Sequence, residues 1–238
     1  MSDPGAHPTD LLHQRIRKWI EKISTPEFRQ FKSQQISYMI SDDFDRKFFG
    51  KEHPDEFLFG DTVEKQHALV LSFLELVGST NSLAQCEYYF RRFPFQGLPI
   101  SKNNHITNIC ELYFGHFYII KNKIWIVAKR LKQACPTPSG DMKAFIKSYV
   151  NEFEQELDWR NKVTHQYAFS DLNIDRILFT EIMSSTEKFK RKGWDREHRR
   201  AYRALSKEWS DRVKQRSIVM QKFVDAVAQW VLDNNTFL

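Results

Sequence analysis

The sequence predicts an all-α protein, a helical bundle with additional helices at its amino and carboxy ends. Apolar residues recur at steps of three and four along most of the 238 residues, the spacing that places them on one face of a helix. No stretch alternates apolar and polar residues for long enough to indicate a strand. Only 8 Gly and 8 Pro interrupt the chain, which favours a few long helices, and 20 Phe predict an aromatic-rich core.

Caps, prolines and glycines divide the chain into successive helices. Thr9 or Asp10 can cap the first helix, and Pro26 restarts the chain because proline fits the first helical turn. Gly and Pro indicate loops at residues 50–60, 93–103 and 136–140. The apolar patterns predict helices over residues 10–23, 26–49, 61–93, 104–133, 141–157 with residues 160–165 directly after it, 172–189 and, beyond a break at Gly193, 202–231.

Basic residues are concentrated near the carboxy end. The chain carries a formal charge of +6. Residues 186–216 hold 12 Lys or Arg against five Asp or Glu, a local charge of +7 that leaves −1 for the rest of the chain. We therefore divide the chain into an amino-terminal helical extension (1–60), a helical core (61–190) and a basic carboxy-terminal helix packed on that core (191–238).

Local basicity of this kind is typical of a protein that binds a polyanion such as RNA. Phe189, Trp194 and Tyr202 lie between the cations and can stack on unpaired bases. The alternative is a solvated helix face with ordinary ion pairs such as Glu208 with Arg212. The residues predicted to hold RNA are Lys190, Arg191, Lys192, Arg196, Arg199, Arg200 and Arg203.

Other site classes have little support in the sequence. Cys86, Cys110 and Cys135 are widely spaced, without a CxxC pair, so they suggest neither a disulfide framework nor a thiolate zinc site and favour a reducing cytoplasm. His105 and His116 lack a ligand partner at zinc spacing, and no glycine-rich phosphate loop is present. Residues 1–10 contain no secretory h-region, and the longest apolar runs fall far short of the roughly 20 residues of a membrane span. We expect a soluble cytoplasmic protein without metal or cofactor.

The most informative motif is Arg160-Asn161-Lys162-Val163-Thr164-His165. RNA can be cleaved without a metal when its own 2′-hydroxyl attacks the neighbouring phosphorus. His165 suits the transfer of that proton because imidazole titrates near neutrality. Arg160 suits the developing phosphate charge, because its planar guanidinium meets two oxygens at once. Asn161 can orient the His or the phosphate by hydrogen bonds.

An Arg followed directly by Asn, with His four residues later, is expected by chance only about 0.02 times in a chain of this composition. The HEPN superfamily, small all-helical domains, has this signature: an Arg, a polar residue that is often Asn, Asp or His, and a His four to six positions after the Arg. The chain resembles this family in Arg160, Asn161 and His165 and in its helical architecture over residues 61–189. Outside the motif there is no sequence match.

The resemblance implies a metal-independent RNA endonuclease. HEPN members include RNases of toxin–antitoxin, abortive-infection and CRISPR systems, so a toxin or defence role and control by an antitoxin or regulatory protein are expected. On a continuous helix a five-residue step rotates by roughly 140°, so Arg160 and His165 do not share a face. Either the helix ends between them, or the site is completed elsewhere. The resemblance implies the second arrangement, a homodimer with a composite cleft, and Tyr167 is a candidate to line it, with core packing as its alternative.

A structural interpretation of the same residues remains open. Arg and His are favoured at the carboxy end of a helix, because cations there offset the helix dipole and bond the last carbonyls. Some HEPN members also serve in binding alone. The alternative function is therefore a non-catalytic helical module that binds nucleic acid or an acidic protein through the basic carboxy-terminal helix.

Overall fold

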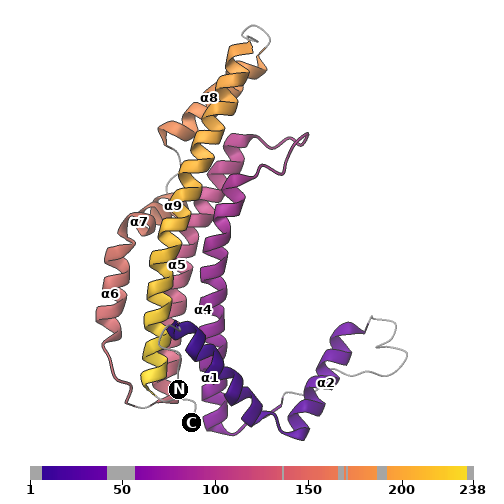
Figure 1. The fold of residues 1–238 in the computed structure, drawn as a ribbon, viewed down its shortest axis with the longest axis vertical. Helices are drawn as coiled ribbons and strands as arrows, with labels where there is room; N and C mark the ends of the chain where they lie inside the picture. The colour runs from indigo at the N-terminus through magenta and orange to yellow at the C-terminus, as the bar shows by residue number, and fades with distance from the viewer. Residues whose placement is uncertain are drawn as a thin grey trace. The chain divides into compact units, whose positions relative to one another are not determined.

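A computed structural model describes residues 7–41, 57–135, 137–165, 169, 171–186 and 192–234, and these residues form helices and connecting segments without a strand (Figure 1). The predicted all-α fold is confirmed. The helices are α1 (Pro8–Ile23), α2 (Pro26–Ile40), α4 (Asp61–Arg91), α5 (Lys102–Ala134), α6 (Met142–Glu152), α7 (Glu154–His165), α8 (Leu172–Ser185) and α9 (Lys192–Asp233).

The helix ends agree with the predicted ones in most places and differ in four. α8 ends at Ser185, with Thr186 as its C-cap, before the predicted end at residue 189. α2 ends at Ile40, and residues 42–49 of its predicted extension lie outside the described residues. The apolar stripe that starts after Asp141 is divided between α6 and α7, because the backbone leaves helical geometry at Phe153 (φ −111°, ψ 26°). The ring of Phe153 is buried 5.0 Å from Phe117 and 5.4 Å from Phe223. α9 begins at Lys192, ten residues before the predicted pattern, so Gly193 lies in its first turn.

The chain forms two compact units, and three helices contribute to both. The first unit comprises Met1–Ser72, Lys129–Ser139 and Asp225–Leu238, and the second comprises Phe73–Ala128 and Gly140–Val224. This grouping follows spatial contacts, whereas the three predicted segments follow chain order, so that linear division stays a prediction.

The first unit contains α1, α2 and the ends of α4, α5 and α9. Leu12, Ile16 and Trp19 form the buried face of α1, and the Trp19 indole donates a hydrogen bond to Gln66 of α4 (2.8 Å). At the other end of α1, the Thr9 hydroxyl donates to Asp225 of α9 (2.6 Å). α1 is therefore attached to α4 and α9 by buried apolar and polar contacts together.

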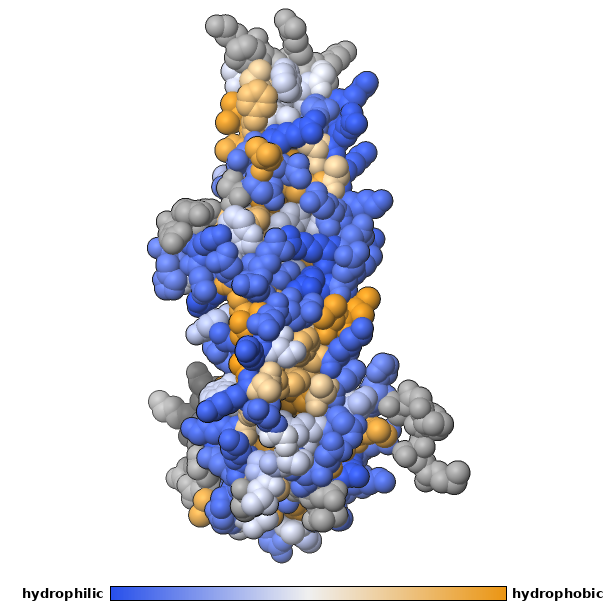
Figure 2. Space-filling model, turned by 90° about the vertical axis from the view of Figure 1, so that its left-hand side faces the viewer, coloured by the Kyte–Doolittle hydropathy of each residue, from blue (hydrophilic) through white to orange (hydrophobic). Residues whose placement is uncertain are grey.

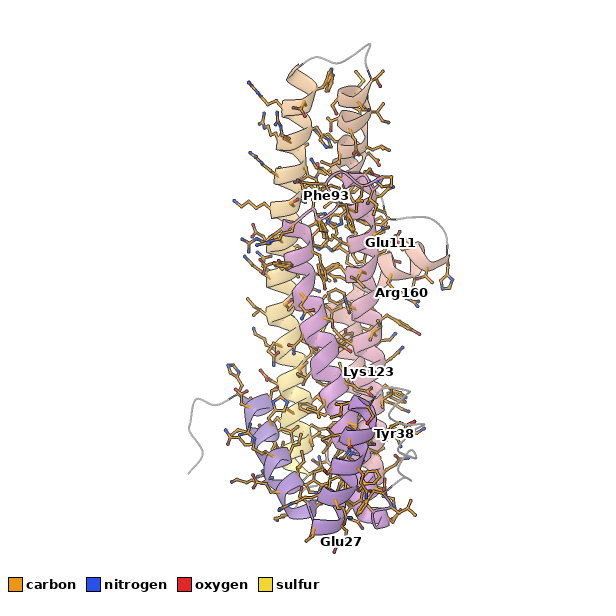
Figure 3. All side chains as sticks on the ribbon, turned by 90° about the vertical axis from the view of Figure 1, so that its right-hand side faces the viewer. Glu27, Tyr38, Phe93, Glu111, Lys123 and Arg160 are labelled. Carbon is orange, nitrogen blue, oxygen red and sulfur yellow. The ribbon has the colours of Figure 1, made fainter. Side chains whose placement is uncertain are left out.

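The second unit is built on α4, α5 and α9, which lie side by side (Figures 1 and 3). α4 and α5 are antiparallel: Glu75 pairs with Lys123, while His105 Nε2 lies 2.9 Å from the carbonyl of Arg92 near the other end of the pair. The Trp209 ring of α9 stacks on Phe90 of α4 (5.2 Å) and meets the edge of Tyr113 of α5 (5.7 Å). The core of this unit is aromatic-rich, as predicted.

The shorter helices are attached to this trio by individual polar contacts. The buried Tyr149 hydroxyl of α6 donates to the carbonyl of Phe117 (2.8 Å). α8 pairs with the first part of α9, where Thr180 Oγ1 lies 3.1 Å from His198 Nδ1. The face that carries α6 and α7 is mainly hydrophilic, with apolar side chains showing between the polar ones (Figure 2). Across the described part of the chain, no helix combines the length and apolarity needed to cross a bilayer.

Candidate functional site

The helix that carries the predicted catalytic motif is held by a buried carboxylate. Glu156 of α7 is 2% exposed and lies between two arginines of α9. Its Oε2 accepts a hydrogen bond from Arg216 Nη2 (3.0 Å), and its Oε1 lies 3.4 Å from Arg212 Nη2. Arg216 also donates to the side chain (2.9 Å) and the carbonyl (2.6 Å) of Glu152, and its guanidinium covers the Phe153 ring. A buried carboxylate needs such partners, so these contacts determine where α7 docks.

Arg160 of α7 is half-buried and lies against α5 (Figure 3). Its guanidinium carbon lies 3.9 Å from the centre of the Tyr118 ring of α5, in cation–π geometry. Its Nη1 donates to Asn161 Oδ1 (3.2 Å). A hydrogen bond from Asn122 and the charge of Arg160 lower the pKa of the Tyr118 phenol. One face of the guanidinium is thus covered by the Tyr118 ring, and one of its N–H groups is bound to Asn161.

Asn161 and His165 are both exposed. His165 is the last residue of α7, and it forms no hydrogen bond or ion pair with any other described residue. Asn161 borders a hollow of about 490 Å³ whose lining includes Glu154 and Asp158. Two carboxylates in the lining repel a phosphate, so this hollow is not suited to the substrate.

The motif residues do not converge within one copy of the chain. α7 is continuous from Glu154 to His165, so the helix does not end between Arg160 and His165. Over five residues a helix turns by roughly 140°, which directs the two side chains to different sides. Of the two possibilities considered from the sequence, the structure contradicts a helix end between these residues. The homodimer stays a prediction.

Apolar side chains are exposed on the surface next to Arg160, and no other described residue packs over them. Leu112, Ile119 and Ile126 of α5 are exposed and seven residues apart, so they form one stripe. The stripe lies beside Tyr118, on which Arg160 stacks. Gly115 lies within it, and a methyl group placed there would meet nothing within 4 Å. Sequence analysis treated these apolar positions as core, although the seven-residue spacing was visible.

A second surface consists of cations along α9. Arg196, Arg200, Arg203, Lys207 and Lys214 are exposed, and their spacing places them within about 60° of arc on a continuous helix. We call these five residues the basic stripe. It is about 27 Å long at 1.5 Å per residue. Sequence analysis included the first three members and missed Lys207 and Lys214, which their helical spacing would have shown.

The other residues predicted to hold RNA are placed differently. Arg199 lies beside the basic stripe and pairs with Asp195 (2.6 Å). Lys192 starts α9, but its side chain, together with Lys190, Arg191 and Tyr167, lies outside the described residues. Of the predicted stacking residues, Phe189 lies outside the described residues. The other two are engaged within the fold: Trp194 meets the edge of Phe179 (5.6 Å), and Tyr202 meets the edge of Phe93 (6.4 Å).

Other chemistry has no site in the described residues. Burial raises the pKa of the Cys86 thiol to about 12, and burial likewise raises the pKa of Cys110, so neither is a ready nucleophile. His105 bonds main-chain carbonyls and His116 is buried. No group of three or more His, Cys, Asp or Glu in the described ranges is arranged to hold a metal ion.

Comparison of the chain with models of protein families, with curated proteins and with solved structures found no match. The functional argument therefore depends on the positions and chemistry of the chain's own residues.

Proposed function

We propose that the chain is a metal-independent RNA endonuclease of HEPN type that acts as a homodimer. The observation that carries the proposal is the Arg160-Asn161-x3-His165 motif, with Arg160 half-buried and Asn161 and His165 exposed, beside an apolar surface without a described partner. A role as a toxin or abortive-infection effector in the cytoplasm, restrained by an antitoxin or regulatory protein, belongs to the same proposal.

Glycines on the exposed helix faces support association of two copies. Gly78 of α4 and Gly115 of α5 both lie inside long helices, where glycine is about 1 kcal/mol less favourable than alanine. A methyl group at either position would meet nothing within 4 Å, so packing within one copy does not require glycine. The Glu75–Lys123 ion pair brings the two helices together here. A close approach by a second copy would account for both glycines.

The dimer would also supply the convergence that one copy lacks. With two copies docked on the α5 stripe, the two α7 helices can lie near each other because Arg160 adjoins that stripe through Tyr118. An imidazole from one copy would then share an RNA phosphate with a guanidinium from the other. His165 would transfer the 2′-hydroxyl proton, Arg160 would stabilise the phosphate charge, and Asn161 would position the reacting groups. The products would carry a 2′,3′-cyclic phosphate or its hydrolysis product.

The second candidate function is RNA binding without cleavage. It is favoured by the separation of Arg160 from His165 on one helix and by the open basic stripe. In this case His165 and Lys162 would serve only as the cations that stabilise the carboxy end of α7.

Cleavage of single-stranded RNA in excess chelator distinguishes the two functions. We expect cleavage by the wild type, with cyclic-phosphate ends, and none by Arg160→Ala or His165→Ala. If the site forms between copies, mixing these two variants should restore part of the activity, because a mixed dimer contains one Arg160 and one His165. An inactive wild type that still binds RNA would refute the nuclease. A monodisperse monomer that cuts RNA would refute the composite site.

A further inference from the structure

A pocket of about 360 Å³ lies between the end of α4 and the middle of α9, in the second unit. It opens beside the basic stripe and is separate from the Arg160 motif. Its lining is composed of cations, hydroxyls and a single carboxylate: Arg91, Tyr202, Arg203, Ser206, Lys207, Ser210, Asp211 and Lys214.

Two of the four cations of this pocket form ion pairs within the described part of the chain, and the other two do not. Glu87 pairs with Arg91 (3.1 Å) and Lys214 (3.4 Å), and these cations with a bond from Ser210 lower the pKa of Glu87 against the opposing effect of burial. Arg203 and Lys207 form no ion pair with any other described residue. They lie four residues apart on α9, where like charges repel. An anion in the pocket would remove that repulsion.

Two hydroxyl-bearing residues, Tyr202 and Ser206, also line the pocket. Ser206 is 8% exposed, and the oxygen atoms of both hydroxyl groups are covered by protein atoms. Burial raises the pKa of the Tyr202 phenol, and the adjacent Ser206 hydroxyl opposes this rise. A group bound in the pocket therefore contacts the open cations rather than these two hydroxyl oxygens.

We infer that this pocket binds one phosphate group of a single-stranded RNA whose backbone follows the basic stripe. A phosphate has enough oxygens to accept a pair of bonds from the Arg203 guanidinium and a third bond from Lys207 at once. A carboxylate has only two oxygens, which makes phosphate the better match. Arg200 and Arg196 continue the stripe from the pocket along α9. The inference takes RNA as the partner from the proposed function but does not depend on cleavage.

The test measures RNA binding in the His165→Ala background, which prevents loss of the probe by cleavage. A labelled single-stranded oligoribonucleotide is titrated by fluorescence anisotropy at several salt concentrations. Arg203→Gln with Lys207→Gln should weaken binding at least about tenfold, and the salt slope should fall by about 0.7, the value for one lost phosphate contact. Ser206→Ala should bind like the parent, because the Ser206 hydroxyl oxygen is covered by protein atoms. Lys222→Gln, an exposed position on the same helix outside the pocket, is the matched control and should bind like the parent.

Each alternative result has a defined meaning. Equal binding by the double variant and the control would overturn the pocket assignment, even if the wild type cleaves RNA. Equal competition by adenosine monophosphate and the oligonucleotide would assign the pocket to a free nucleotide and overturn the RNA strand. Equal competition by polyglutamate would reduce the pocket to a nonspecific basic surface. Pocket-dependent RNA binding by a wild type that does not cleave would refute the nuclease and keep the pocket.

Discussion

Glu156→Gln tests the contacts that hold α7 in place. The substitution preserves the shape of the side chain but leaves Arg212 and Arg216 without their shared charge partner. Removing one member of a buried ion pair costs about 3–5 kcal/mol. Arg216 and Arg212 retain 22% and 31% side-chain exposure, and Arg216 keeps its bonds to Glu152. We therefore expect a loss of about 2–3 kcal/mol in the free energy of unfolding.

For a chain of this length, about 2–4 °C of melting temperature corresponds to 1 kcal/mol, so the midpoint should fall by roughly 5–10 °C. Urea unfolding followed by circular dichroism measures the free energy directly. Glu154→Gln is the matched control because Glu154 is an exposed glutamate on the same helix. A Glu156→Gln variant as stable as the control would refute the argument that this carboxylate fixes α7. Cleavage should fall with the loss of α7 docking, although the chemistry of His165 is unchanged.

Two further predictions concern pH and the α5 surface. Burial, and then the charge of Lys102, lowers the pKa of His198, and burial lowers the pKa of His116. Below about pH 6.5 the unfolded chain then binds more protons than the folded chain. The free energy of unfolding should therefore fall as the pH drops from 6.5 toward 5, with full stability above that range. His198→Gln should flatten this pH dependence in thermal melts, and an unchanged slope would contradict the assignment of the pH dependence to His198. Gly115→Ala should stabilise the monomer by up to about 1 kcal/mol through helix propensity. The same substitution should weaken dimerisation, measured by analytical ultracentrifugation. An unaltered dimer would show that the exposed stripe of α5 is not part of the dimer interface.

The helical elements were largely predictable, because the spacing of apolar residues that are close in the sequence indicates a helix. The predicted starts of α1, α2, α4 and α8 agree with the structure to within two residues. The break at Phe153 was not predictable in this way. It accompanies burial of that ring against Phe117 and Phe223, which lie 36 and 70 positions away in the chain.

The candidate site was likewise predictable only in part from the sequence. Helical spacing alone indicates that Arg160 and His165 face different directions and that cations align along α9, since both depend only on the turn per residue. Spacing does not reveal that Arg160 rests on Tyr118, or that Glu87 occupies Arg91 and Lys214 while Arg203 and Lys207 remain open.

By itself the sequence determined the helical class, most helix positions, the motif and the location of positive charge, because each is encoded by neighbouring residues. The tertiary structure alone decided which charges are neutralised, which hydroxyls are buried and which apolar stripes remain exposed. Those properties depend on side chains brought together from distant positions, such as Glu87 with Lys214 and Glu156 with Arg216, and pairing over such separations has no local signal.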